Sequence, residues 1–161
     1  MLRAAHEIAS GMADDVRRIA DAVYPGLLGR FGLYPALESV RVRAKERSGL
    51  EVTVDATRCD RALPLGVTTA LYGVAEEAIR NVEQHSCART ARITLESRGN
   101  TVELRIEDEG TGFDPETLDG HYRGLGLFRS RELLAHAGGE LQVISAPGHG
   151  TKVLATAVVE E

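Results

Sequence analysis

The sequence is poor in cysteine, and the two cysteines that it has are not arranged as a cross-link. Cys59 and Cys87 lie far apart along the chain and form no CxxC pair. Neither a zinc site nor a disulfide framework is therefore indicated. Because nothing in this pattern calls for an oxidising compartment, we expect a reducing, cytoplasmic environment.

The sequence also lacks a long hydrophobic run and an excess of positive charge. No apolar run approaches the roughly 20 residues that a helix needs to cross a bilayer, and the N-terminus has no continuous apolar segment like that of a signal peptide. The net charge is -5, whereas surfaces that bind nucleic acid or anionic lipid are basic. We expect no nucleic-acid partner and no membrane contact by this segment.

The rest of the composition is ordinary for one compact globular domain. Hydrophobic residues make up 43% and charged residues 27% of the 161 positions, which argues against disorder. A chain of this length can bury a real core, but it leaves no room for a second full domain. Internal repeats and low-complexity tracts are absent from the sequence.

The first half of the chain is predicted to be mostly helical. Apolar residues three or four apart form one stripe near the N-terminus, and Pro25 should end that helix. Gly49 stands just beyond the end of a second predicted helix, and alternating residues after it predict a strand. The elements predicted here are helices over 2–23, 35–47 and 65–85 and a strand over 50–54.

The second half is predicted to contain strands around one long loop. Alternating residues predict two strands joined at Gly99-Asn100, although this is a weaker turn signal than Asn-Gly. The segment 108–126 contains five glycines and one proline, and a loop of this length in a compact domain is usually functional. The elements predicted here are strands over 91–98, 101–107, 140–145 and 151–159 and a helix over 127–137.

Together these elements predict an α+β fold. Its architecture should be a two-layer α/β sandwich, in which a mixed, mostly antiparallel sheet carries helices on one face. The helix over 2–23 precedes this sandwich and could belong to another part of a larger assembly.

One row of polar residues follows the long central helix. Glu77, Asn81 and His85 are four residues apart, so each step turns only about 40° around the helix axis. The adjacent arc is apolar, whereas Glu76 and Glu83 are expected to point away from the core. The row therefore borders the core as the wall of a cleft would. By itself, the pattern fits a solvated helix flank better.

Three further blocks could approach a ligand. Asp108 ends a predicted strand and can accept a hydrogen bond, and glycines after it would allow close approach of the backbone. A glycine-rich start of the next helix would favour a phosphate, through free N–H groups and the helix dipole. Each block alone could be a simple turn. The residues of these blocks are Asp108, Gly110, Gly112, Gly124, Gly126, Leu127 and, in the last strand after a predicted hairpin turn, Thr151.

In this order, the polar row and the three blocks resemble the N, G1, G2 and G3 boxes of the Bergerat-fold ATPases. That superfamily includes gyrase, heat-shock chaperone, histidine kinase and mismatch-repair ATPases. The order of the blocks, their spacing and their predicted secondary structure all agree with the resemblance. A longer run over 72–85, the segment 124–141 and the linker-like segment 24–37 are similar to sensor histidine kinases that pair with LuxR-type response regulators.

The resemblance implies ATP and Mg²⁺ as cofactors and assigns roles to the matching residues. In that family the counterpart of Asp108 binds the adenine amino group, supported by Thr151, and the counterpart of Asn81 ligates magnesium. Glu77 matches the general base, and His85 matches a residue near the phosphates. The predicted nucleotide-binding residues are Asn81, His85, Asp108, Gly110, Gly112, Gly124, Gly126, Leu127 and Thr151.

The chain departs from the family pattern at a few positions. Gln84 stands where many relatives have lysine, which removes one possible phosphate contact. Ser86 replaces a common alanine, and Ser130 replaces a common apolar residue. A single phenylalanine, Phe113, follows the G1 block, so no separate F box is predicted.

The phosphoryl-accepting histidine of a histidine kinase is not predicted in this chain. His6 is followed by Glu7, as is usual for such a histidine, but too few residues separate it from Pro25 for two dimerisation helices. The resemblance instead divides the chain into 1–24, the end of a dimerisation and phosphotransfer helix, 25–49, a linker and first helix region, and 50–161, the ATP-binding catalytic domain. The missing dimerisation and phosphoacceptor helices are therefore expected partners.

Other functions remain open on the sequence alone. Anti-sigma-factor kinases use the same ATP site to phosphorylate a protein serine, and a degenerate domain would bind nucleotide without transfer. The expected partner of a histidine kinase is a response regulator with a LuxR-type output domain, and its expected location is cytoplasmic, including the cytoplasmic part of a membrane-bound sensor. A gyrase-type ATPase would need a further domain that this length excludes. We expect a monomer or a weak dimer.

Overall fold

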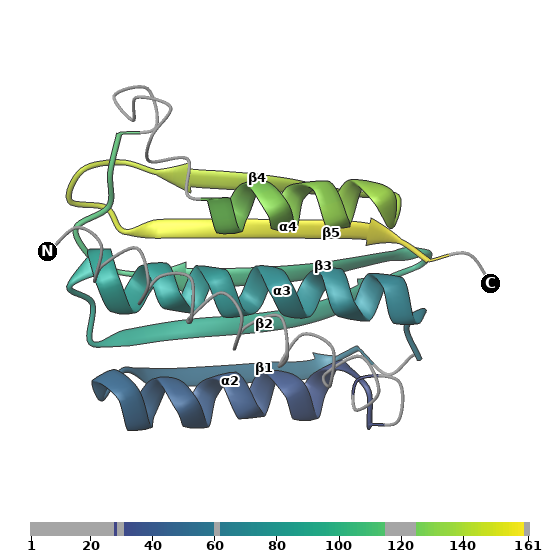
Figure 1. Ribbon diagram of the computed structural model, residues 1–161, viewed down its shortest axis with the longest axis horizontal. Helices are drawn as coiled ribbons and strands as arrows, with labels where there is room; N and C mark the ends of the chain where they lie inside the picture. The colour runs from purple at the N-terminus through teal and green to yellow at the C-terminus, as the bar shows by residue number, and fades with distance from the viewer. Residues whose placement is uncertain (1–27, 29–30, 60–61, 115–124, 160–161) are drawn as a thin grey trace, which may run out of the picture.

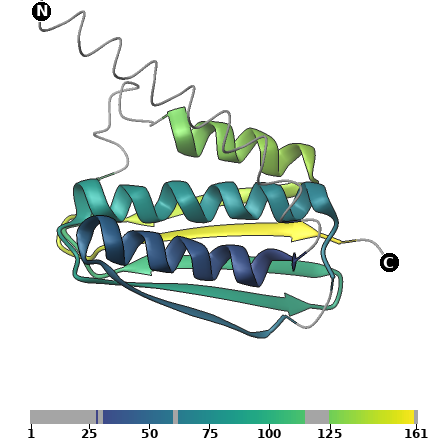
Figure 2. The same ribbon diagram turned by 60° about the horizontal axis from the view of Figure 1, so that its bottom comes forward.

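The protein folds into two layers, a five-stranded sheet and three helices that cover one of its faces (Figures 1 and 2). The computed structural model describes residue 28 and residues 31–59, 62–114 and 125–159. The helix predicted over 2–23 and His6 lie outside these residues. This architecture confirms the predicted α+β sandwich. The elements are α2 (Leu33–Ser48), β1 (Glu51–Arg58), α3 (Leu65–Asn81), η1 (Val82–Ser86), β2 (Thr90–Arg98), β3 (Thr101–Asp108), α4 (Leu125–His136), β4 (Gly139–Ser145) and β5 (Thr151–Val158).

The sheet is mixed, as the sequence predicts. Its strand order is β1-β2-β3-β5-β4, with β1 parallel to β2 and all other neighbours antiparallel. Strands β2 and β3 form the predicted hairpin at Gly99-Asn100, and Gly99 adopts a φ of 58° there. The pairing places the last residue of β3, Asp108, directly opposite the first residue of β5, Thr151. Two residues that are 43 positions apart thus meet at one end of the sheet.

The core lies between the sheet and the helices. Alternate strand residues point toward the helices, and Ile93 and Leu104 are completely buried there. Central helix α3 contributes Leu71 and Val74, which are also completely buried. Because burial of a large aliphatic side chain stabilises a fold by about 1.5–3 kcal/mol, this layer dominates the stability of the sandwich. It also fixes the height of α3 above the sheet.

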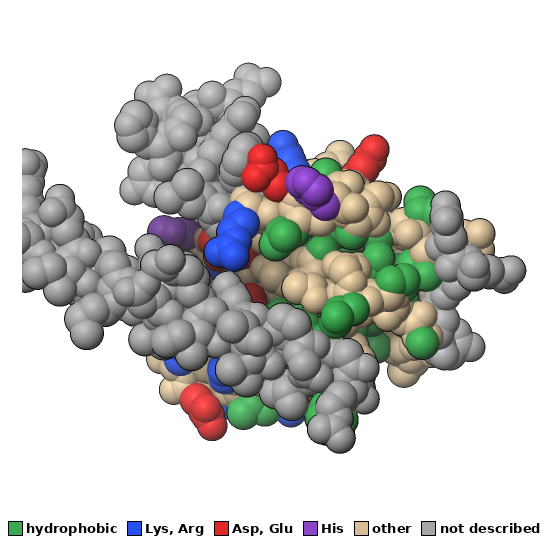
Figure 3. Space-filling model, turned by 45° about the vertical axis from the view of Figure 1, so that its right-hand side comes forward, with side chains coloured by type: hydrophobic (Ala, Val, Ile, Leu, Met, Phe, Trp, Pro, Cys, Tyr) green, Lys and Arg blue, Asp and Glu red, His purple; other side chains and the backbone are tan. Residues whose placement is uncertain are grey.

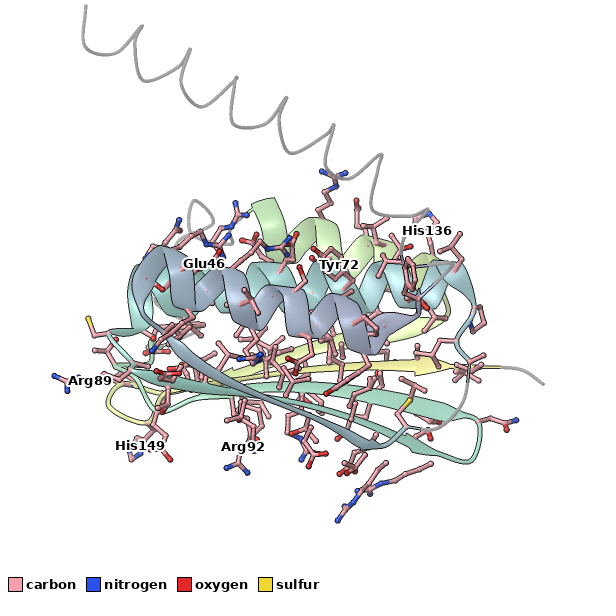
Figure 4. All side chains as sticks on the ribbon, turned by 90° about the horizontal axis from the view of Figure 1, so that it is seen from below. Glu46, Tyr72, Arg89, Arg92, His136 and His149 are labelled. Carbon is pink, nitrogen blue, oxygen red and sulfur yellow. The ribbon has the colours of Figure 1, made fainter. Side chains whose placement is uncertain are left out.

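Polar contacts attach α2 to α3 along their shared side. Arg43 Nη2 lies 2.8 Å from Tyr72 Oη and 2.5 Å from Glu76 Oε1, and Arg47 Nη2 lies 2.9 Å from Glu83 Oε2. Figure 4 shows Tyr72 within this helical layer. Glu83, which was expected to point away from the core, packs against Arg47, and its side chain is only 9% exposed. It faces α2, a neighbour that the periodicity of one helix does not reveal.

The predicted helix over 65–85 is not a uniform α-helix. The α-helix ends at Asn81, and the chain continues as a single π-helical turn from Val82 to Ser86. Cys87 follows with a φ of 56°, which is the left-handed region and is rare for residues other than glycine. Such π-turns are frequent at functional sites. This one carries His85.

The rest of the described surface is mixed in character. The exposed fraction is 62% for Phe31 and 53% for Val158, and Figure 3 shows hydrophobic side chains in several groups over the visible face. Arg92 and His149 project from the sheet on the side away from the helices (Figure 4). Within the described part of the chain, no helix is long and apolar enough to cross a membrane.

Candidate nucleotide site

A cavity of about 330 Å³ opens between the helical layer and the sheet, where α3 passes into η1. Its volume lies at the lower end of the usual range for small-molecule sites, about 300–1,000 Å³. The walls come from the end of α3, η1, the β3 end, the following loop, α4 and the two C-terminal strands. The residues that line it are Ala78, Asn81, Val82, His85, Ser86, Ile106, Asp108, Thr111, Gly112, Phe113, Leu127, Val143, Thr151 and Val153.

The structure brings most of the predicted site residues to this cavity. Asn81 and His85 line it from the helical side, and Asp108 and Thr151 line it from the sheet. Leu127 contributes from the first turns of α4. Four separate sequence blocks therefore converge on one hollow, as the resemblance implies.

The remaining predicted residues occupy other positions. Glu77 lies one helical turn before Asn81 and is half-buried, but it is not among the residues that line the cavity. Gly110 lies in the loop after β3, and Gly126 belongs to the first turn of α4. Gly124 lies outside the described residues.

Asp108 is the most unusual polar group in the cavity. It is only 8% exposed, and burial raises the pKa of its carboxyl above the ordinary value. The backbone N–H groups of Gly110 and Thr151, which donate to the carboxylate, and the nearby Ser86 hydroxyl lower the pKa, but they do not outweigh burial. The Gly110 N–H lies 2.8 Å from Asp108 Oδ1. A buried carboxylate with remaining acceptor capacity is suited to a ligand N–H.

Gly110 and Gly112 allow the protein's own backbone to pack closely around Asp108. A Cβ at Gly110 would lie 2.2 Å from the Ser86 carbonyl oxygen, and one at Gly112 would lie 2.1 Å from the Ala146 carbonyl oxygen. Gly112 also has a φ of 59°, which strains any other residue. These glycines let the loop approach both η1 and the β4–β5 turn.

Backbone hydrogen bonds hold the loop in this position. The Thr111 N–H donates to the Ser86 carbonyl over 2.7 Å, and the Gly148 N–H donates to the Thr111 carbonyl over 2.6 Å. Thr111 therefore bridges η1 on one side and the turn before β5 on the other. A shift of η1 would therefore move the loop that follows Asp108.

The apolar part of the cavity was not predicted as part of the site. Ala78 and Val82 line it from the helical side, and Ile106, Val143 and Val153 line it from the sheet. These residues give a flat aromatic ring an apolar surface, while Asp108 offers one polar anchor. In the sequence, these residues were marked only by the apolar periodicity that placed them on the inward side of the helix and the strands. Ordinary core residues show the same periodicity, so it could not distinguish residues of the cavity wall from residues of the core.

A second hollow lies on the face of the sheet away from the helices, with a volume of about 820 Å³. Asp108 and Thr151 line both hollows, so only the sheet separates them at this end. The second hollow is open and lined by charges of both signs. Lys152 and Glu107 pair with each other there at 2.8 Å. It therefore lacks the apolar, single-anchor character of the first cavity.

A metal would find few protein ligands in the described residues. No group of three or more histidine, cysteine, aspartate or glutamate side chains gathers there as a metal site. Asn81 offers one amide oxygen at the cavity wall. This fits a magnesium ion that takes its other oxygens from water and phosphate, since Mg²⁺ keeps several waters and commonly uses only one or two protein ligands.

Comparison with known proteins agrees with the fold. Residues 66–160 match the family described as histidine kinase-, DNA gyrase B-, and HSP90-like ATPases. The chain is 34% identical to the sensor histidine kinase MctS of Rhizobium johnstonii, over 92% of this chain and 32% of that protein. It is 29% identical to the sensor histidine kinase ComP of Bacillus subtilis, over 91% of this chain and 19% of that protein.

A solved structure supports the same architecture. The blue-light activated histidine kinase of Erythrobacter litoralis superimposes with a TM-score of 0.65 at 20% identity, over 79% of this chain and 42% of that one. At this identity the similarity concerns the fold alone. The chain also spans about a third or less of the length of the curated relatives described above.

The fold and the cavity define an ATP-binding ATPase domain of the Bergerat type. The chain belongs to the family of histidine kinase-, DNA gyrase B-, and HSP90-like ATPases. Within that family it is an ATP-binding catalytic domain of the sensor histidine kinase type.

Proposed function

We propose that this domain binds Mg-ATP in the cavity and transfers the γ-phosphoryl group to a histidine of a dimerisation helix. The observation that carries the proposal is Asp108, a buried carboxylate at the strand end, in the same cavity as Asn81 and His85. Phosphoryl transfer depends mainly on positioning and charge neutralisation. A domain that holds the two ends of the nucleotide between a sheet and a helix would provide the positioning.

Asp108 would orient the nucleotide by its base. An exocyclic amino group that donates to the carboxylate would replace water lost on burial, and the apolar walls would cover the ring. Asn81 and His85 lie on the helical wall and would face the phosphate end. Helix α4 begins at the same cavity, so its free N–H groups and positive dipole end would also favour phosphate.

Asn81 would hold the magnesium ion through its amide oxygen, and the ion would neutralise phosphate charge. Glu77 would act on the acceptor instead of the nucleotide. Its position one turn from Asn81, outside the cavity lining, suits a carboxylate that orients or deprotonates an imidazole brought by another helix.

The histidine acceptor and the response regulator belong to this proposal as partners. The relatives MctS and ComP are named as sensor histidine kinases, which favours histidine over a protein serine as the acceptor. Residues 1–24 would be the end of a dimerisation helix, 25–49 a linker and first helix region, and 50–161 the catalytic domain. A relative of the same type, the nitrate/nitrite sensor NarX of Escherichia coli, favours a response regulator with a LuxR-type output domain. The expected location is cytoplasmic, including the cytoplasmic part of a membrane-bound sensor.

Calorimetric titration with ATP tests the site directly. Wild-type protein should bind ATP more tightly with Mg²⁺ than without it, and Asp108→Asn should lose most of the affinity because an amide presents a donor as well as an acceptor. Asn81→Ala should lose the Mg²⁺ dependence and retain weak binding. Asp55→Asn is a matched control, because Asp55 is an exposed carboxylate on β1 whose Oδ1 accepts hydrogen bonds from Thr57 of the same strand, and it does not line the cavity. Absence of ATP binding by the wild type would contradict the proposed function.

A further inference from the structure

Ser145 does not touch the cavity, yet its hydroxyl is the centre of three hydrogen bonds around it. Ser145 is the last residue of β4 and lies directly opposite Thr151 in the sheet. Its Oγ lies 3.0 Å from the Phe113 backbone nitrogen, 2.8 Å from the Gly150 carbonyl oxygen and 3.0 Å from Thr151 Oγ1. Phe113 and Thr151 both line the cavity, whereas Ser145 does not.

The chemistry of these partners decides the direction of each hydrogen bond. A serine hydroxyl has one proton and two lone pairs. The Phe113 N–H can only donate, so it occupies one lone pair, and the Gly150 carbonyl can only accept, so it takes the proton. One lone pair of Ser145 remains for Thr151. The Thr151 hydroxyl must therefore donate to Ser145.

This direction leaves the Thr151 hydroxyl with no proton to offer to the cavity. Its lone pairs remain. Asp108 and Thr151 are paired residues of β3 and β5, and the Thr151 backbone N–H donates to the Asp108 carboxylate, so the hydroxyl and the carboxylate belong to the same end of the sheet. The sheet wall of the cavity thus presents two neighbouring acceptors. Such a pair suits a ligand edge that carries an amino group and disfavours an edge that carries a carbonyl at the same place.

We propose that Ser145 is a positioning residue that holds the Thr151 hydroxyl as an acceptor and so sets the preference of the cavity for an amino-bearing purine. The inference rests on the proposed function, since it concerns the base of the same nucleotide. Ser145 acts only through Thr151 and Phe113. Its loss would free the Thr151 hydroxyl to rotate and to donate to a carbonyl.

The test compares ATP with inosine triphosphate, which has a carbonyl where ATP has the amino group. The ratio of the two dissociation constants is measured for the wild type, Ser145→Ala, Thr151→Val and the double variant. Ser145→Ala should reduce the preference for ATP by about tenfold, the effect of one hydrogen bond whose direction is lost. In the Thr151→Val background, Ser145→Ala should not change the ratio further, because the hydroxyl that it orients is gone.

Two more variants separate positioning from loss of structure. Ser145→Thr keeps a hydroxyl at the same strand position and should restore the wild-type ratio. Ser97→Ala removes another strand serine, which bonds to the Arg58 carbonyl at a distance of 3.2 Å and does not line the cavity, and it should leave the ratio unchanged. Thermal unfolding of each variant shows whether it is folded.

The outcomes distinguish this inference from the proposed function. If Ser145→Ala weakens both nucleotides equally, Ser145 is only a structural support and the inference is wrong. The same conclusion follows if Ser145→Ala changes the ratio equally with and without the Thr151 hydroxyl. If the wild type binds neither nucleotide, the proposed function itself fails.

Discussion

The guanidinium of Arg43 on α2 donates a hydrogen bond to the phenol oxygen of Tyr72 on α3, over 2.8 Å. Tyr72 is only 5% exposed, and the same guanidinium also pairs with Glu76. Burial raises the pKa of the Tyr72 phenol well above its ordinary value of 10.0, and Arg43 opposes this shift only partly. The native state therefore requires Tyr72 to stay protonated.

This requirement predicts a loss of stability at alkaline pH. The folded pKa is raised, so the contribution of Tyr72 is fully present below pH 10 and is lost progressively as the unfolded phenol ionises above that value. Tyr72→Phe should cost about 0.5–1.5 kcal/mol near pH 8, the usual value of one hydrogen bond, and should flatten the decline above pH 10. Denaturant unfolding between pH 8 and pH 11 measures both effects. Tyr34→Phe is the control, since Tyr34 is 50% exposed and should leave the alkaline decline unchanged.

We expect the Asp108 carboxylate to favour ATP binding but to lower the stability of the fold at neutral pH. Burial raises its pKa, so the fold favours the protonated carboxyl, and stability is lost as pH rises from the ordinary pKa of 3.8 through the raised value. Asp108→Asn should therefore bind ATP poorly while unfolding at the same temperature as the wild type or a few degrees higher at pH 7. Calorimetric unfolding from pH 4 to pH 7 should show the difference growing with pH. A large fall in the unfolding temperature of Asp108→Asn at pH 7 would contradict this interpretation of the carboxylate.

We expect that replacing Cys87, which lies next to the site, by glycine stabilises the protein. Its φ of 56° places it in the left-handed region, which costs a residue with a Cβ about 1–2 kcal/mol. Cys87→Gly should remove this strain and raise the unfolding free energy by up to about 1 kcal/mol, because the greater flexibility of unfolded glycine offsets part of the gain. Cys87→Ala keeps the strained backbone and should show no such gain. Equal stability of the glycine and alanine variants would show that the turn relaxes without cost.

Two glycines of the same fold predict opposite effects of a methyl group. A Cβ at Gly73, inside α3, would meet only Ser130 Oγ at 3.9 Å, which is an ordinary contact. Gly73→Ala should stabilise the protein by about 0.5–1 kcal/mol through its better helix propensity. Gly110→Ala should destabilise it by about 1–3 kcal/mol, because the new methyl group would strike the Ser86 carbonyl at 2.2 Å. Denaturant unfolding of both variants decides this, and a destabilised Gly73→Ala would mean that α3 and α4 pack more tightly than these distances indicate.

The sequence predicted much of the fold because periodicity and turn chemistry are local. The alternation around Gly99-Asn100 was enough to predict the β2–β3 hairpin, and Gly49 correctly marked the end of α2, where it has a φ of 74°. The same local patterns placed Asn81 on a helix and Asp108 at a strand end. Their convergence on one cavity was inferred from family resemblance, and the sheet pairing with the packing of α3 accounts for it.

Other features depend on contacts between distant residues, and no local pattern carries them. The π-helical turn over 82–86 interrupts a sequence that reads as one continuous helix, and the carbonyl of its last residue, Ser86, accepts a hydrogen bond from Thr111 in the loop after β3. Glu83 has the polar character of an exposed residue, and its side chain is largely covered by contact with Arg47, which lies 36 positions earlier on α2.

By itself, the sequence determined most of the helices and strands, their order and the types of residue available for a nucleotide site. The tertiary structure alone decided which groups meet and which way each hydroxyl donates. Ser145 shows the difference most clearly, since its one proton is directed by a carbonyl and an amide from two other segments. Hydrogen-bond direction depends on the complete set of neighbours of a group, and only the folded chain brings those neighbours together.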